Sequence, residues 1–478
     1  DELRAKPGAT DASPEYPEGF WATKAREAQD AGHPLPDHLR VHKPYIDHWT
    51  YDSPFAEGEG GARPRMRRVP EVIDCWWDAG SMPFAQWGYP HAPDSEKAFA
   101  ERFPADFISE AIDQTRGWFY GLLAINTLLF TGDQAPVRRD YPLPYRTCIV
   151  LGHMMGEDGL KMSKRTKNYK EPSYVFDTLG ADAMRWYFFS AQTPWTSVRF
   201  QEAAIRDAQR EMLVRLYNVF SFFNIYANID GFTVHRAGEA AAAGSQAAVT
   251  GRRAPAQRSE IDRWILSELH ITIREVRAAL DRFENYPAAQ KLIAFVDALS
   301  NWYVRRCRDR FWRSIEGGDS ERDQDKWDAY NTLYECLTTL SRLIAPFTPF
   351  FAETMYQNLE AVEPPGRQEA EQHSRADSGE ACLPNPLSVH MCDYPAPDES
   401  LIDETLAEEM DLVRDIASLG LAARAQAKLR VRQPLARVEI ILARPEHEQW
   451  LSRHASLIAE ELNVKEVEFT AHADHYVE

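Results

Sequence analysis

Two lysines three residues apart are the part of this sequence best suited to chemistry. They are Lys161 and Lys164, in the segment Asp158–Tyr169 (DGLKMSKRTKNY). Ammonium groups on a loop preceded by Gly159 can close over a triphosphate and stabilise the charge that builds when pyrophosphate leaves an α-phosphate. A solvated basic turn is the alternative for any K-x-x-K spacing. An apolar strand-like run before the segment and a helical pattern after it favour phosphate binding.

A second candidate site precedes the lysine pair, in Phe103–Tyr120 (FPADFISEAIDQTRGWFY). The letters DFISE predict a short buried strand, and the apolar run Trp118–Phe130 predicts a helix packed on the sheet. Ligands of open α/β sheets bind at the carboxyl ends of strands, which is where Glu110–Gln114 would lie. We therefore expect the polar side chains of that stretch to meet a ligand.

These segments resemble the class I aminoacyl-tRNA synthetases. Lys161-Met162-Ser163-Lys164-Arg165 is similar to their KMSKS-type loop, and Phe103–Tyr120 resembles the isoleucine-specific members more than the valine, leucine and methionine enzymes. Arg165 and the segment Lys428–Leu435 (KLRVRQPL) resemble the eukaryotic-like branch. The resemblance extends over nearly the whole chain from His42 onward.

The resemblance implies an isoleucine–tRNA ligase reaction. L-isoleucine and ATP, with Mg²⁺, would give isoleucyl-adenylate, and the acyl group would pass to the terminal ribose of tRNA(Ile). Lys161 and Lys164 would be catalytic through their charge on the pyrophosphate, and Met162, Ser163 and Lys164 would bind ATP. Positioning and preorganised charge carry such a displacement, so no side-chain nucleophile is needed.

The resemblance also implies an adenylate-binding set upstream. Glu110 would hold the α-ammonium group of the substrate, because a desolvated ammonium needs a charged partner. Asp113 and Gln114 would contact the adenylate, and Trp118 and Trp76 would wall the isoleucine pocket. The family often has glycine where this chain has Ala111, so a Cβ occupies that turn.

The chain is acidic overall, with 54 basic and 73 acidic residues and a formal net charge of −19. Taken alone, this balance argues against a nucleic-acid partner. Two basic islands, Arg305–Arg313 (RRCRDRFWR) and Ala423–Arg437 (ARAQAKLRVRQPLAR), could nevertheless grip a phosphate backbone. The alternative for each island is a solvated helix face. The predicted tRNA contacts are Arg424, Lys428, Arg430 and Arg432.

The six cysteines show no C-x-x-C spacing, so no zinc site is predicted. Ser53–Gly61 stands where many family members carry a cysteine pair, and it contains no such ligands. Scattered thiols fit a reducing cytoplasm. No secretory signal opens the chain, and its longest apolar run is too short for a bilayer. We expect a soluble cytoplasmic protein, and by resemblance a monomer.

The expected fold is the second half of a doubly wound α/β nucleotide-binding fold, then an all-α bundle and a small α/β module. Long amphipathic patterns from Glu202 onward, such as Trp264–Phe283 and Leu333–Leu359, predict the bundle helices. The predicted segments are 1–41, an insertion or linker; 42–153, the C-terminal half of a Rossmann-type catalytic domain; 154–201, the lysine loop and a connecting module; 202–362, an anticodon-binding bundle; 363–399, a linker; and 400–478, the terminal module.

Class I synthetases carry a second signature, H-x-G-H, which these 478 residues lack, as they lack any trace of an editing domain. We therefore expect the chain to be the C-terminal portion of a longer enzyme, inactive alone; a divergent complete protein is the alternative. The alternative function is that of a non-catalytic tRNA-binding paralogue, in which the basic islands would be functional and the lysine loop would be a relic. Intact Glu110, Lys161 and Lys164 favour the enzyme, because a relic site is free to lose them. A valine or leucine enzyme is the competing specificity.

Overall fold

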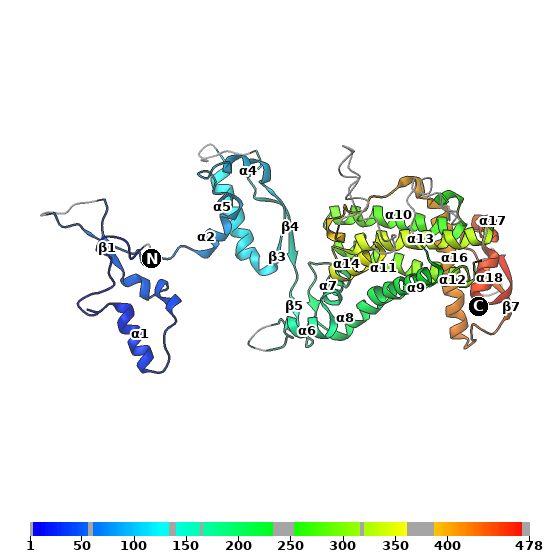
Figure 1. Cartoon of the computed structure of the whole chain (residues 1–478), viewed down its shortest axis with the longest axis horizontal. Helices are drawn as coiled ribbons and strands as arrows, with labels where there is room; N and C mark the ends of the chain where they lie inside the picture. The colour runs from blue at the N-terminus through cyan, green and yellow to red at the C-terminus, as the bar shows by residue number, and fades with distance from the viewer. Residues whose placement is uncertain are drawn as a thin grey trace. The chain divides into compact units, whose positions relative to one another are not determined.

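A computed structural model describes residues 3–55, 61–132, 140–162, 165, 167–232, 253–315, 320–360 and 387–470. The chain divides into two compact units, Asp1–Cys148 and Ile149–Glu478, and each is described by itself. Figure 1 shows their elements coloured along the chain. Most of the predicted linker 363–399 lies outside the described residues.

The first unit begins with a small aromatic cluster. Phe20 and Trp21, at the start of a helix, are buried; the Phe20 ring stacks on His48 with 3.6 Å between centroids, and Trp21 meets Tyr45 edge-on. The elements here are α1 (Phe20–Asp30) and the antiparallel strands β1 (Thr50–Asp52) and β2 (Arg65–Arg67). The sequence predicted only an insertion or linker over 1–41, because two adjacent aromatic residues create no periodicity.

The rest of the first unit carries the predicted strand and helix. Its elements are α2 (Cys75–Gly80), α3 (Met82–Ala85), α4 (Ser95–Arg102), β3 (Ala105–Ala111), the 3-10 helix η4 (Ile112–Arg116), α5 (Trp118–Phe130) and β4 (Tyr145–Leu151). The predicted helix is confirmed residue for residue. The strand is confirmed in position, but not as a buried strand: Ile108 is buried, whereas Phe107 is 49% exposed.

The exposure of β3 follows from its sheet. β3 and β4 form a two-stranded sheet, and the described strands make four such pairs in all. The continuous doubly wound sheet expected from the sequence is therefore not present among the described residues. Packing in this region comes instead from Phe99, Phe103 and Phe130, whose rings lie 4.7–5.5 Å apart.

The second unit begins with a small module around the lysine loop. Strands β5 (Met154–Met155) and β6 (Val198–Arg199) pair in parallel, and the helices α6 (Pro172–Leu179), α7 (Ala181–Ser190) and α8 (Glu202–Gln209) follow the chain into the bundle. A separate apolar cluster that includes Val175, Tyr187 and Ile205 holds this module together.

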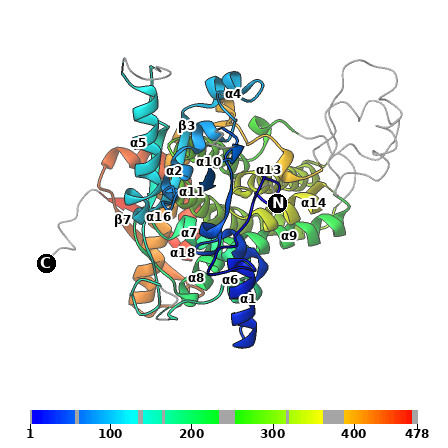
Figure 2. The same cartoon turned by 90° about the vertical axis from the view of Figure 1, so that its left-hand side faces the viewer.

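A bundle of long helices fills most of the second unit, as Figures 1 and 2 show from two directions. Its members are α9 (Arg215–Asp230), α10 (Glu260–Asp281), α11 (Asn285–Asp297), α12 (Arg305–Trp312), α13 (Glu321–Ile344) and α14 (Pro349–Glu360). The predicted helical segment Leu333–Leu359 is broken, because Pro346 and Pro349 have no N–H to continue the ladder. Short π-helical stretches, Arg210–Val214 and Ala298–Val304, precede α9 and α12.

The C-terminal elements share the core of the bundle. α16 (Glu404–Gln426) leads to β7 (Leu435–Ile441), α17 (Glu448–Leu451), α18 (Ala455–Leu462) and β8 (Val464–Thr470), and β7 pairs in parallel with β8. Buried residues of α16 and α18, such as Met410, Val413 and Ile458, belong to the same apolar cluster as the bundle helices.

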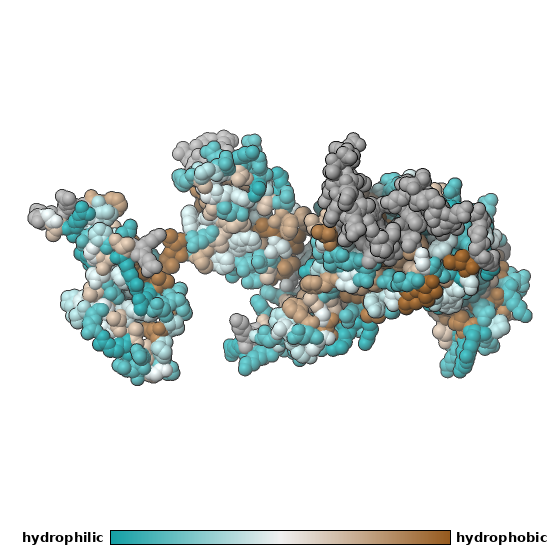
Figure 3. All heavy atoms as spheres, in the orientation of Figure 1, coloured by the Kyte–Doolittle hydropathy of each residue, from teal (hydrophilic) through white to brown (hydrophobic). Residues whose placement is uncertain are grey.

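One helix of the bundle presents apolar side chains to solvent. Figure 3 shows a brown patch over α9, where Ile225 and Ile229 are 53% and 71% exposed. No helix in the described part of the chain is both long and apolar enough to cross a membrane.

Candidate functional site

Three of the predicted pocket residues come together in the first unit around a glycine. Asp74 caps α2 by accepting a hydrogen bond from the backbone N–H of Trp76 at 2.7 Å, which fixes where that indole starts. A Cβ added at Gly117 would lie 2.9 Å from Cζ2 and Cη2 of Trp76 and 2.6 Å from Oε1 of Gln114. The indole therefore lies directly against the Gly117 backbone.

Hydrogen bonds fix the other two members of this group. Gln114 Oε1 accepts from the N–H of Trp118 at 2.9 Å, at the open N-terminus of α5. Trp118 Nε1 donates to the carbonyl of Ala79 at 3.1 Å, which joins α5 to α2. We name Trp76, Gln114, Gly117 and Trp118 the tryptophan cluster. The sequence analysis did not single out Gly117. The signal that could have identified it is that Gly117 is the one residue without a side chain between Gln114 and the helix.

Glu110 and Asp113 lie beside the tryptophan cluster in sequence, at the end of β3 and in η4. Both side chains are exposed, and neither carboxylate has an ion pair or hydrogen bond with a described residue. Ala111, between them, has φ −69° and ψ 157°. That conformation suits any residue, so the methyl group in place of the family's frequent glycine causes no backbone strain.

The lysine loop in the second unit is a tight hairpin. Gly159 adopts φ +77°, and its N–H donates to the carbonyl of Gly156 at 2.9 Å. Lys161 forms an antiparallel bridge with Met155, and its side chain is exposed. Asn168 Nδ2 lies 3.2 Å from Oδ2 of Asp158 and 3.4 Å from the Lys161 carbonyl. Asn168 was not anticipated from the sequence, where it is one polar residue among many.

Met162 anchors the loop to the module beneath it. Its N–H donates to the Met154 carbonyl at 3.2 Å, and its side chain packs against the apolar cluster that contains Val175 and Tyr187. Ser163 and Lys164 lie outside the described residues. The structure thus places Lys161 and Met162 on opposite faces of the loop, with the ammonium toward solvent and the thioether toward the core.

Four of the five arginines in the first basic island, Arg305–Arg313, make ion pairs within the protein, and the fifth, Arg308, is exposed. Arg306 holds Glu461 at 2.6 Å and Glu460 at 2.7 Å, and Arg305 also pairs with Glu461, so α12 is tied to α18. Arg313 pairs with Asp325. The charges of these three arginines are therefore used within the protein, although Arg305 stays exposed, as the solvated helix face would have it. The glutamates that pair with Arg305 and Arg306 lie 154–156 residues further along the sequence, which no local pattern reveals.

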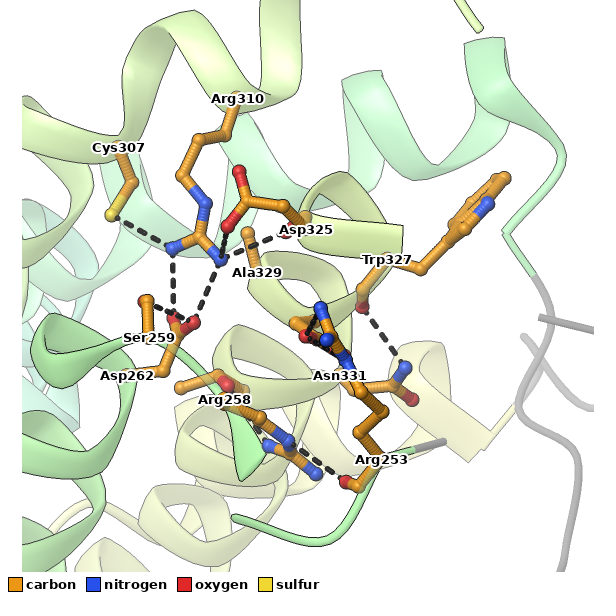
Figure 4. A network of polar contacts seen from close by, with 12 residues as sticks. Arg253, Arg258, Ser259, Asp262, Cys307, Arg310, Asp325, Trp327, Ala329 and Asn331 are labelled. Carbon is orange, nitrogen blue, oxygen red and sulfur yellow. Dashed lines mark hydrogen bonds and ion pairs between the residues drawn. The ribbon is translucent and has the colours of Figure 1, made fainter. Parts of the chain in front are cut away.

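Arg310 of the same island belongs to a buried network, shown in Figure 4. Its Nη1 and Nη2 lie 2.8 and 2.7 Å from the two carboxylate oxygens of Asp262, which is fully buried and also accepts from Tyr303 and Ser259 at 2.6 Å each. Burial raises the pKa of Asp262, but the hydrogen bond and charge of Arg310 outweigh it, and the pKa is lowered from the ordinary 3.8. This arginine is structural.

The second basic island differs from the first. Lys428, Arg430 and Arg432 are exposed on the connection between α16 and β7, and none has an ion pair with a described residue. Arg424 does not share their position: it is 5% exposed, and its Nη2 donates to the carbonyl of Arg430 at 2.6 Å. Three of the four predicted tRNA contacts are thus open to a ligand, and the fourth is internal.

Neither unit offers a metal centre within the described residues. No group of three or more His, Cys, Asp or Glu side chains there could hold an ion. The five described cysteines are free thiols, and Cys382 lies outside the described residues.

Comparison with known protein families matches both parts of this arrangement. Residues 43–200, which carry the tryptophan cluster and the lysine loop, match the family described as tRNA synthetases class I (I, L, M and V). Residues 262–440 match the anticodon-binding domain of tRNA ligase, and this match continues through α16 and into β7. Over both regions, the chain is thus similar to the class I tRNA synthetases.

Among relatives, the similarity is to one specificity. The chain is 44% identical to the isoleucine–tRNA ligase of Dehalococcoides mccartyi over 432 residues, 90% of this chain and 37% of that protein. It is 40% identical to the Clostridium novyi enzyme and 42% to the Deinococcus radiodurans enzyme, over 94% and 92% of this chain and 38% and 35% of theirs. The chain belongs to the isoleucine–tRNA ligase family, and it spans little more than a third of the length of these relatives.

One solved structure supports the fold. A LeuRS from Agrobacterium radiobacter, solved in a ternary complex with tRNA and LeuAMS, matches with a TM-score of 0.50 and 18% identity. The match covers 76% of this chain and 37% of that one. At this identity, the likeness concerns the arrangement of the backbone.

Proposed function

We propose that this chain supplies the adenylate-binding residues, the lysine loop and the tRNA-binding bundle of an isoleucine–tRNA ligase. The whole enzyme activates L-isoleucine with ATP and transfers it to tRNA(Ile). The observation that carries the proposal is the tryptophan cluster, in a chain 40–44% identical to isoleucine–tRNA ligases. The Arg165 and Lys428–Leu435 features further suggest the eukaryotic-like branch of that family.

In the amino-acid pocket, the tryptophan cluster supplies apolar walls. Trp76 is 39% exposed although it packs on Gly117, so part of its indole is free to cover an aliphatic side chain. Glu110 holds the α-ammonium group, for which an unpaired carboxylate is the suitable partner. Asp113 and the amide nitrogen of Gln114 contact the adenylate. The nitrogen is the available atom of Gln114, because its Oε1 already accepts a hydrogen bond from the N–H of Trp118.

At the phosphates, the lysine loop supplies positive charge. Lys161 and Lys164 stabilise the leaving pyrophosphate, and Mg²⁺ enters with ATP and shares the charge. Ser163 contacts ATP beside them. Met162 contributes by holding the loop on the apolar cluster, so the ammonium of Lys161 stays on the solvent side.

On the tRNA, the exposed side chains of Lys428, Arg430 and Arg432 contact the phosphate backbone. The local excess of positive charge on this connection opposes the net charge of −19 of the whole chain. Such a distribution permits a specific contact while the acidic remainder suppresses non-specific binding.

The test of the catalytic assignment is isoleucine-dependent pyrophosphate exchange in a full-length ligase that contains this sequence. Lys164→Ala and Lys161→Ala lower the exchange rate by orders of magnitude and leave tRNA affinity nearly unchanged, because they act on the transition state of the first step. Lys170→Ala is the matched control: Lys170 lies 3.9 Å from Glu202, outside the motif. A wild-type exchange rate in Lys164→Ala would refute the assignment.

A further inference from the structure

The connection between α16 and β7 is held in an unusual backbone shape. α16 ends with hydrogen bonds from the N–H of Leu429 to the carbonyl of Arg424 at 2.8 Å and from the N–H of Lys428 to the carbonyl of Ala425 at 3.0 Å. Lys428 itself has φ +56°. Helices that end in this way usually place glycine in the left-handed position. A lysine persists there only when its surroundings fix the conformation.

Two side chains from outside the connection supply that fixation. Arg424, buried beneath it, donates from Nη2 to the carbonyls of Arg430 and Gln433, and lies 3.4 Å from the carbonyl of Val431. Asn463, which follows α18, donates from Nδ2 to the same Val431 carbonyl at 2.8 Å. Nε and Nη1 of Arg424 have no partner in the described part of the chain, so one nitrogen makes the contact.

All the acceptors in these contacts are backbone carbonyls. We call these contacts of Arg424 and Asn463 the clamp. The clamp uses none of the basic side chains of the connection, and Lys428, Arg430 and Arg432 remain exposed. Three like charges within five residues repel one another and favour an open, variable loop. Contacts to phosphates fix the register of a bound nucleic acid only when their donors are themselves fixed in space.

We propose that Arg424 is a positioning residue for tRNA binding: with Asn463 it clamps the carbonyls of residues 430–433 so that Lys428, Arg430 and Arg432 present their charges together to the phosphate backbone. Arg424 acts through this loop and does not touch the nucleic acid. The inference rests on the proposed tRNA contact of these three side chains.

The test measures binding of the 478-residue chain to a tRNA(Ile) transcript between about 50 and 200 mM salt. A loop variant, Lys428→Asn with Arg430→Gln and Arg432→Gln, removes the three charges while asparagine tolerates the left-handed position. We expect it to reduce the salt slope by about three, one for each phosphate contact. Arg424→Gln reduces the slope by at least about one and the affinity about tenfold or more. Arg424→Lys, which keeps one ammonium nitrogen, restores most of the affinity.

The decisive comparison is Arg424→Gln added to the loop variant, where it has no further effect if it acts through the loop. Faster amide exchange at Leu429 and Gln433 in Arg424→Gln, with unchanged exchange in α10, reports loss of the clamp in a folded bundle. Asn463→Gly removes the second donor and tolerates the left-handed φ of +49° at this position. It should lower the affinity in the same way as Arg424→Gln but by less, and it replaces Arg424→Gln as the test if that variant does not fold.

The outcomes separate the inference from the proposed function. A wild-type chain that binds tRNA without salt dependence, or not at all, contradicts the proposed tRNA contact. Salt-dependent binding that the loop variant weakens and Arg424→Gln does not, or an effect of Arg424→Gln that persists in the loop variant, overturns the positioning role alone.

Discussion

Removing Arg310 tests whether the first basic island serves the fold and not the nucleic acid. Asp262 is 0% exposed, and the Arg310 guanidinium holds both of its oxygens at 2.7 and 2.8 Å. Arg310→Met leaves that carboxylate buried with Tyr303 and Ser259 as its remaining donors. A buried ion that loses its partner costs about 3–5 kcal/mol, so we expect a loss of this size.

The partner substitution is expected to cost less. Asp262→Asn leaves Arg310 with the carboxylate of Asp325 at 2.9 Å and with the Asp325 backbone carbonyl at 2.8 Å. The loss is then about 1.5–3 kcal/mol, the value for a hydrogen bond to a charged group. The double variant loses less than the sum of the two, by about 0.5–3 kcal/mol, because the residues interact directly.

Native-state hydrogen exchange of amides in α10 and α12 measures these differences for the bundle alone. The folded pKa of Asp262 is below 3.8, so the difference between wild type and Asp262→Asn stays constant from about pH 7 to 5 and shrinks as the pH falls below about 4. The salt slope of tRNA binding by the folded variants stays that of wild type. If the Arg310→Met variant were as stable as wild type and showed a reduced salt slope of tRNA binding, the structural role of Arg310 would be refuted.

Two further substitutions test the proposed isoleucine pocket and a partly buried carboxyl group between α10 and α16. Gly117→Ala in a full-length ligase displaces the Trp76 indole and the Gln114 side chain, because the new Cβ would lie 2.9 Å from the indole and 2.6 Å from Oε1 of Gln114; overpacking of about 1–3 kcal/mol raises the KM for isoleucine about 5–150-fold. An unchanged KM for isoleucine would remove Trp76 from the pocket wall. Burial and the nearby charge of Asp411 raise the pKa of Glu268 from 4.5 to about 7, so the folded chain holds this proton longer and loses stability as the pH rises between these values. Glu268→Gln therefore stabilises the bundle by up to about 3 kcal/mol at about pH 8 and not at about pH 4, measured by hydrogen exchange in α10; an equal gain at both pH values contradicts this origin.

Helices were predictable where one local property decides them. The run Trp118–Phe130 is apolar on nearly every side and ends as expected, and Trp264–Phe283 shows a clear apolar stripe that became α10. α1 was missed, because its packing comes from Phe20 stacking on His48, which lies 28 residues further along the chain. The burial of β3 was overestimated, because a strand's alternation does not tell how many neighbours it has.

Site residues were predictable when a motif names them and not when a partner defines them. Trp76, Gln114 and Trp118 came from the resemblance, and the structure brings them together; Gly117 completes the group by its lack of a side chain. The residues of the two basic islands look alike in sequence. The islands differ because the acids Glu460 and Glu461 on α18 meet one of them, and because Arg424 turns inward at the other.

The central claim, an isoleucine-specific ligase, is tested most directly by amino-acid-dependent pyrophosphate exchange in the full-length protein. We expect exchange that depends on isoleucine and is weaker with valine by about 1–3 kcal/mol in kcat/KM, a limit for which isoleucine–tRNA ligases are themselves the standard case. Leucine and methionine should support little exchange. Exchange driven best by valine or leucine would contradict the specificity, and tRNA binding with no exchange for any amino acid would leave a tRNA-binding paralogue.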